Sequence, residues 1–290
     1  GRIATPLLDL TSVGVSGGVA VAAGQRLRPG QDWGQPTASG PGRIVAFDVA
    51  DPAHPRVAAS LDVAGTPLDL ALAEDLACIA SGSAGLRLLR VEVALPGPRP
   101  TARPSASPAP HRTTAWLPFA SARSGLPRGG TAPVHGFRQE GGAVTALAAS
   151  GGRLHAGDRL YAGIGSRLAV LEVDAANTPA VMGSSALLPR PIIDIAIVGD
   201  YAYALAGDRA LATISLADPA APALLDLRPL AASSRRLAAG GGALCIAQGE
   251  AGLRLLDLSD PALPRPAGRA ALGGRVDDVA VAAGHAFVAD

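Results

Sequence analysis

The sequence of 290 residues contains no lysine, one asparagine and two cysteines, Cys78 and Cys245. All of its basic side chains are therefore arginine or histidine, which is typical of a GC-rich bacterial genome. Two cysteines are too few for a disulfide framework. The net charge is only +1, so we expect no electrostatic attraction to nucleic acid and no nucleic-acid partner.

Aromatic residues make up only 3% of the chain, although 48% of its residues are hydrophobic. Small apolar side chains favour close packing of sheets on sheets over a large aromatic core. No window approaches the roughly 18 unbroken apolar residues that a membrane span needs, so no transmembrane segment is expected. No window of useful length shows the apolar spacing of an amphipathic helix.

Glycine and proline are abundant, with 36 and 25 residues, and they occur in a repeated pattern. The stretch VGDYAYALAGDRALATISLADPAAP at Val198–Pro222 returns with changed residues as GGGALCIAQGEAGLRLLDLSDPALP at Gly240–Pro264. A shorter copy, EDLACIASGSAGLRLLRVEV, occupies Glu74–Val93. Polar and apolar residues alternate in each copy with the period of two that is typical of strands.

Each repeat predicts four strands and one tight turn. In the copy around Asp218 the strands are Asp194–Val198, Tyr201–Leu205, Ala210–Leu216 and Ala223–Leu227. An Asp-Pro turn precedes the fourth strand. The pair favours a tight turn because Pro fixes φ and Asp can bond its own backbone. Hairpins of the first two strands are predicted at six places, near Ser12–Ala23, Leu68–Ala80, Val144–Ala162, Ile192–Leu205, Arg236–Ala247 and Val276–Ala289.

The spacing of the repeats indicates a propeller. The step from Asp218 to Asp260 is 42 residues, and four strands in about 40–45 residues are typical of a propeller blade. We predict an all-β fold, a six-bladed β-propeller of four-stranded antiparallel blades in one domain over residues 1–290. Thr5–Leu10 matches a fourth strand, so we expect the N- and C-termini to share the closing blade. The third strand of that blade is missing, and we expect the natural chain to continue past Asp290.

The segments AGLRLLDLSDPALP, YAYALAG and IVAFDVADPAHP resemble the LVIVD-repeat β-propellers of bacteria and archaea. In that family the repeat reads roughly G-x-A-Y-V-A, followed by G-L-x-V-x-D-V-S-D-P-x-x-P. The resemblance implies a propeller that works outside the cytoplasm, in the periplasm, at the cell surface or secreted. It implies no chemistry, because the motif residues are structural.

Two insertions, at residues 25–42 and 96–142, interrupt the repeats and contain both tryptophans. Tryptophan is enriched at interaction hot spots, but each could instead pack its insertion onto the ring. The longer insertion is locally basic and is either a solvated arm or an anion site. It also contains Thr113–Phe119, predicted as the displaced fourth strand of the second blade. The candidate partner-binding residues are Trp33, Trp116, Phe119 and Arg112.

Aligning the repeats places one polar residue of each blade at the same point of the innermost strand. These strands line the channel of a propeller, so the six residues would form a polar ring at its mouth. The aspartates could hold a cation or small ligand, or each could accept backbone N–H bonds inside its own blade. An arginine in the ring weakens a metal site, because it can neutralise a neighbouring carboxylate. The ring consists of Ser12, Asp69, Thr145, Asp194, Arg236 and Asp278.

The two cysteines occupy equivalent positions in the second and fifth blades, which are opposite one another in a ring of six. A disulfide needs Cα atoms within about 7 Å. We therefore predict that Cys78 and Cys245 are buried free thiols that fill space as small apolar groups.

No sequence motif points to catalysis: H-E-x-x-H, the Walker sequence, G-x-S-x-G and C-x-x-C are all missing. Calcium-dependent hydrolytic propellers use acidic and amide oxygens, yet the one asparagine, Asn177, lies in an outer turn. We expect no catalytic residues, no cofactor and no metal. The predicted function is a non-catalytic, extracytoplasmic protein-binding or scaffolding module that contacts other subunits through its insertions. The alternatives are a metal-dependent hydrolase or small-ligand sensor at the channel mouth, and a structural surface protein.

Overall fold

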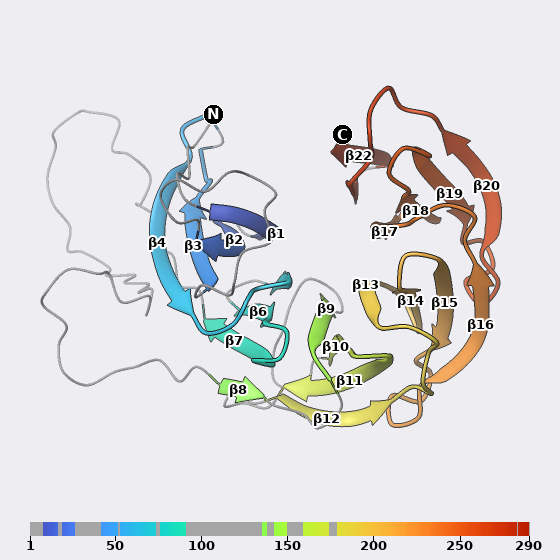
Figure 1. Cartoon of the computed structure of the whole chain (residues 1–290), viewed down its shortest axis with the longest axis horizontal. Helices are drawn as coiled ribbons and strands as arrows, with labels where there is room; N and C mark the ends of the chain where they lie inside the picture. The colour runs from blue at the N-terminus through green and yellow to red at the C-terminus, as the bar shows by residue number, and fades with distance from the viewer. Residues whose placement is uncertain are drawn as a thin grey trace, which may run out of the picture.

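The structure is a computed structural model that describes residues 8–16, 19–26, 42–51, 53–73, 76–90, 135–137, 142–149, 159–173, 179–282 and 284–289. The described residues form 22 strands. They include no helix long and apolar enough to cross a bilayer. The strands belong to six antiparallel sheets, which follow one another around a common centre (Figure 1).

The first three sheets each contain four strands in sequence order. The first sheet consists of β1 (Leu8–Ser16), β2 (Val19–Arg26), β3 (Gly42–Asp48) and β4 (Arg56–Val63). The second consists of β5 (Asp69–Ala73), β6 (Leu76–Ala80), β7 (Leu86–Arg90) and β8 (His135–Phe137). The third consists of β9 (Val144–Ala149), β10 (Arg159–Ile164), β11 (Arg167–Val173) and β12 (Pro179–Ser184).

The next two sheets repeat this order, and the last is a pair of strands. The fourth sheet consists of β13 (Ile192–Val198), β14 (Tyr201–Ala206), β15 (Ala210–Ser215) and β16 (Ala223–Pro229). The fifth consists of β17 (Arg236–Gly240), β18 (Ala243–Ala247), β19 (Leu253–Asp257) and β20 (Arg265–Ala270). The sixth consists of β21 (Asp278–Ala282) and β22 (His285–Ala289).

Every predicted hairpin is a strand pair in the structure. Ser12 pairs with Ala23, Asp194 with Leu205, and the other four hairpins pair in the same way. The first strand of each complete sheet faces the centre and the fourth lies on the outside (Figure 1). The antiparallel sheets of the predicted fold are therefore confirmed.

The ring is open between the first and last sheets (Figure 1). Leu8–Leu10, expected in a closing blade with the C-terminal strands, instead pair with Gly24–Arg26 as part of β1. They can do so because an irregularity in register between Leu10 and Ser12 lets β1 continue along β2. In the described part of the chain, β21 and β22 have no further strand beside them.

The prediction of Thr113–Phe119 as the fourth strand of the second sheet was wrong. The outer edge of β7 pairs with β8, where Leu86 lies opposite Phe137, and its other edge pairs with β6. Each outer strand must lead directly to the next inner strand, and β8 ends shortly before β9 begins at Val144. Thr113–Phe119 lies outside the described residues.

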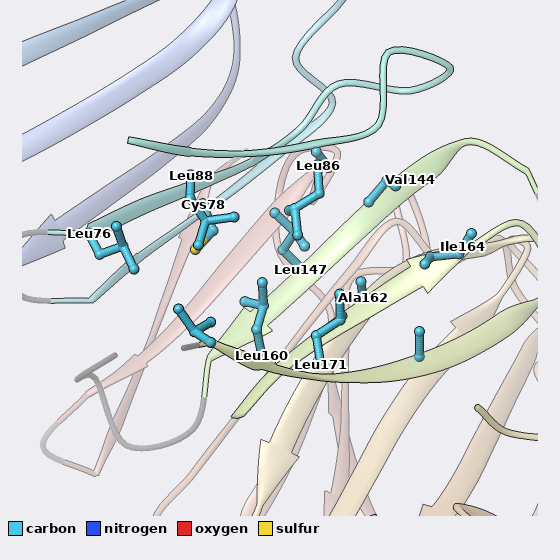
Figure 2. Packing of buried hydrophobic residues seen from close by; sticks show 13 residues of the cluster. Leu76, Cys78, Leu86, Leu88, Val144, Leu147, Leu160, Ala162, Ile164 and Leu171 are labelled. Carbon is cyan, nitrogen blue, oxygen red and sulfur yellow. The ribbon is translucent and has the colours of Figure 1, made fainter. Parts of the chain in front are cut away.

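The core lies between consecutive sheets. Figure 2 shows Leu76, Cys78 and Leu88 of the second sheet facing Leu160 and Leu171 of the third. Similar apolar clusters fill the junctions of the first and second, third and fourth, fourth and fifth, and fifth and sixth sheets. Each sheet thus buries its apolar faces against its neighbours in the ring.

Both cysteines are free and buried, as predicted. Cys78 lies on β6 in the second sheet and Cys245 on β18 in the fifth. Burial raises the pKa of the Cys78 thiol to about 12. The two thiols therefore act as small apolar groups in two separate junctions.

Candidate functional site

Asp69, the first residue of β5, is a buried carboxylate that joins its own sheet to the sheets on either side. Its Oδ1 accepts hydrogen bonds from the Leu70 amide at 2.8 Å and from the Ser12 hydroxyl at 3.1 Å. Its Oδ2 accepts a bond from the amide of Leu147, which lies on β9 of the third sheet, at 2.8 Å. The side chain therefore connects the second sheet to both of its neighbours.

Asp194 repeats this arrangement at the junction of the fourth and fifth sheets. Its Oδ1 accepts a bond from the Ile195 amide at 3.0 Å, and its Oδ2 accepts one from the Leu237 amide of β17 at 2.6 Å. In both residues one carboxylate oxygen accepts a hydrogen bond from an amide of the same sheet, as predicted. The other oxygen accepts a hydrogen bond from an amide of the next sheet. We call a polar side-chain bond of this second kind, between neighbouring sheets near the centre, an inner clasp.

Two threonines supply inner clasps at the remaining junctions among the first four sheets. The Thr11 hydroxyl donates to the carbonyl of Pro67 at 2.8 Å, just before β5. The Thr145 hydroxyl donates to the carbonyl of Ile192 at the start of β13. At the junction of the fifth and sixth sheets, Arg235 and Asp277 form an exposed ion pair at 3.0 Å. Each junction in the ring thus has a polar side-chain bond near the centre.

Thr145 does not occupy the ring position that the sequence alignment predicted. Asp194 pairs with Leu205, and the residue at the equivalent place in the third sheet is Ala146, paired with Gly163. The register of β9 and β10 shifts between Gly163 and Ile164, and this leaves Thr145 unpaired. The first and fourth sheets have the same irregularity at Thr11 and Ile193, so Thr145 corresponds to these residues and lies one position before the ring.

Asp278 has the same register as Asp69 and Asp194 but lies at the open side of the ring. It pairs with Ala289, and its Oδ1 accepts a bond from the Val279 amide at 2.8 Å. Unlike Asp69 and Asp194, it is exposed. The three aspartates are therefore not equivalent in this structure.

Arg236 extends from β17 across the channel. Its guanidinium donates to the carbonyls of Ile193 and Thr11, each at 3.4 Å, and lies 3.9 Å from Asp194. It lines a hollow of about 680 Å³ together with Thr11, Ile193 and Asp278. A cation placed among the three aspartates would meet this guanidinium.

Burial raises the pKa of Asp194 to about 7, and the negative charge of Asp69 acts in the same direction. Arg236 and the two bound amides oppose this shift. Burial also raises the pKa of Asp69, against Arg236 and the amides of Leu147 and Leu70. Both carboxyls therefore favour the protonated form more strongly in the folded chain than in the unfolded one.

These shifts predict that the protein is more stable at pH 5 than at pH 8, by about 2 kcal/mol. Between the unfolded pKa of about 3.9 and the folded value, the folded state holds a proton on Asp194 that the unfolded state has lost. Unfolding then releases a proton, so the free energy of unfolding falls as the pH rises. Urea denaturation at both pH values measures the difference. Asp194→Asn should remove much of the stability difference between the two pH values. An equal difference in wild type and variant would contradict its assignment to protonation of Asp194.

The geometry gives the inner carboxylates a structural role. Both oxygens of Asp69 and of Asp194 already accept backbone hydrogen bonds. Nowhere in the described ranges do three His, Cys, Asp or Glu side chains converge as ligands for a metal ion. The donor set present therefore suits the joining of sheets better than the binding of a cation.

The predicted partner-binding residues Trp33, Trp116, Phe119 and Arg112 all lie outside the described residues. Among the described residues, sequence reasoning missed the clasp of Thr11, although this threonine directly precedes Ser12. Sequence reasoning also missed the amide partners of the aspartates, because every residue type has a backbone amide and the sequence therefore does not indicate which one binds.

Comparison with known proteins supports the repeat and the fold. Residues 191–226 and 231–270 match a protein-family model. That family is the LVIVD repeat. The predicted resemblance is therefore confirmed for the copies that form the fourth and fifth sheets. A search of the curated proteins finds no match to the sequence.

Solved structures similar to the chain include propellers. A protein from Lactobacillus plantarum is 13% identical with a TM-score of 0.59, over 94% of this chain and 74% of its own. The Cps50 (Swd1) β-propeller domain of Myceliophteria thermophila is 14% identical with a TM-score of 0.57, over 93% and 76%. A chain of the Mitotic Checkpoint Complex is 12% identical with a TM-score of 0.58, over 94% and 70%. Identities this low establish the β-propeller fold alone.

Proposed function

We propose that the protein is a non-catalytic protein-interaction module that works outside the cytoplasm as a subunit of a larger assembly. One observation carries the proposal: the polar side chains at the centre hold neighbouring sheets together. Recognition is then left to the outer surface and to the insertions. A similar chain was solved as part of the Mitotic Checkpoint Complex, and the LVIVD match agrees with a repeat scaffold.

We also propose that the ring closes in the working protein, by contact of the first sheet with the last. Val13 and Val15 lie on the face of the first sheet that points away from the second, and they are 62% and 67% exposed. Phe287 lies on the face of the last sheet that points away from the fifth and is 60% exposed. Each apolar face lacks the partner sheet that buries its equivalents elsewhere in the ring.

The register of Asp278 supports the same closure. Asp69 and Asp194 each bind the amide one residue beyond the equivalent position of the next inner strand. In the first sheet that amide belongs to Val13, which follows Ser12. Closure would therefore give Asp278 an inner clasp to Val13.

The insertions at residues 25–42 and 96–142 are proposed to contact the other subunits through Trp33 and Trp116. Replacing both with alanine should reduce the amount of partner that co-purifies with the tagged protein by about tenfold, because buried tryptophans dominate interface energetics. Quantitative mass spectrometry of the purified assemblies measures the effect. The control is Leu187→Ala, which removes an exposed apolar side chain from a loop between β12 and β13. Undiminished partner recovery with the tryptophan variant would contradict the proposal.

A further inference from the structure

Three arginines gather where the outer parts of the fourth and fifth sheets meet. Arg254 of β19 lies directly opposite Arg269 of β20. Arg228 of β16 donates a hydrogen bond to the carbonyl of Pro264, just before β20. We call these three residues the arginine groove.

Their positions in the sheets show that they share one side. Leu256, two residues from Arg254 on the same strand, packs in the core between the fourth and fifth sheets. Arg228 pairs with Leu211, which belongs to the same core cluster. Side chains alternate along a strand, so Arg254, Arg269 and Arg228 all point into the junction of these two sheets.

The pair of like charges is peculiar to the fifth sheet. The equivalent pairs in three other sheets are Val45–Ser60, Ala169–Ser184 and Ala212–Leu227. Like charges directly opposite one another destabilise a sheet. Burial lowers the pKa of Arg254, and the charges of Arg269 and Arg228 lower it further. Repulsion between like charges therefore destabilises the fifth sheet at a position where the first, third and fourth sheets have no such pair.

The groove has little negative charge of its own. Asp226 lies 3.1 Å from Arg228 and neutralises it in part. Among the described residues, no carboxylate lies within ion-pair distance of Arg254 or Arg269. The free guanidiniums can each bind a carboxylate through two parallel hydrogen bonds.

We propose that the arginine groove binds an acidic segment of a partner protein, which lies extended along the outer edge of β20. This inference rests on the proposed role as an interaction module and adds a second contact surface to it. β20 is the outermost strand of its sheet, and no described strand pairs with its outer edge. Such an edge offers backbone donors and acceptors to an added strand, while alternate acidic side chains would reach the arginines. An oligonucleotide fits less well, because it cannot pair with a strand edge and the chain carries a net charge of only +1.

The test uses two labelled peptides, Glu-Thr repeated four times and the neutral Gln-Thr repeat, with the full chain at low salt. We expect the glutamate peptide to bind at least about tenfold more tightly than the glutamine peptide. The double variant Arg254→Val with Arg269→Ser recreates the Val45–Ser60 pair of the first sheet, and it should lose that preference. The control is Arg56→Glu, which changes an exposed arginine at the start of β4, the outer strand of the first sheet.

The double variant should also unfold at a temperature higher than wild type by about 1–3 °C, because it removes the like-charge pair. This readout shows that lost binding does not come from lost folding. Equal affinity for the two peptides would overturn the proposal, as would an equal loss in Arg56→Glu. Tighter binding of a single-stranded oligonucleotide with the same dependence on Arg254 would replace the acidic segment with nucleic acid. None of these results affects the tryptophan test, so the two proposals fail separately.

Discussion

Replacing Phe287 with aspartate should lower the free energy of unfolding by about 3 kcal/mol. Such a loss is unexpected for a side chain that is 60% exposed. It follows from the proposed closure, in which Phe287 packs against Val13 and Val15 of the first sheet. A carboxylate at this place would be buried without a partner. Urea denaturation, followed by the circular dichroism of the strands, measures the loss.

The control for this substitution is Leu187→Asp. Leu187 is 65% exposed and lies between β12 and β13, away from the open side of the ring. An exposed loop position should change stability by no more than about 0.5 kcal/mol. If Phe287→Asp is as mild as Leu187→Asp, the two apolar faces stay in water and the closure is wrong.

Replacing Asp194 with alanine should cost about 3 kcal/mol of stability at pH 5. The substitution leaves the amides of Ile195 and Leu237 without their acceptor at the junction of the fourth and fifth sheets. An unsatisfied buried donor costs about 1–3 kcal/mol. The loss should be smaller at pH 8, because the wild-type protein there carries the cost of a buried charge on Asp194. Thermal and urea denaturation at both pH values measure the two losses.

Thr213→Val is the matched control for this variant. Thr213 is 1% exposed on β15 of the same sheet, so the substitution tests burial of a polar side chain without touching a clasp. A loss in Asp194→Ala no larger than in Thr213→Val would show that the inner clasps contribute little to the joining of sheets. A loss that grows from pH 5 to pH 8 would contradict the raised pKa.

Much of the fold could be predicted from the sequence because its signals are local. Alternation with a period of two identified the strands, and the turn residues separated them, so the predicted hairpins agree with the observed pairs. The outer strand of the second sheet was missed because His135–Phe137 lies inside the predicted insertion at residues 96–142 and is too short to show alternation. The closing of the ring depends on contacts between distant parts of the chain, which no local pattern reports.

The site could be predicted only in part. Asp69 and Asp194 stood out as acidic residues before apolar runs, and both lie buried at the inner ends of their sheets. The partner of each second oxygen is a backbone amide of the next sheet, and its position depends on how the sheets pack. Thr145 was assigned to the ring, although it is the unpaired residue just before the ring position, which Ala146 occupies. The pairing of Arg254 with Arg269 needed the register of β19 and β20, which sequence alone does not supply.

The central claim is that polar residues inside the ring give stability and that recognition takes place outside it. It is tested most directly by the amount of partner that co-purifies with Asp194→Asn, measured per folded molecule well below its unfolding temperature. We expect recovery within about twofold of wild type, although the free energy of unfolding falls. Loss of the partner from folded Asp194→Asn molecules would show that the inner carboxylate takes part in recognition and would contradict the claim.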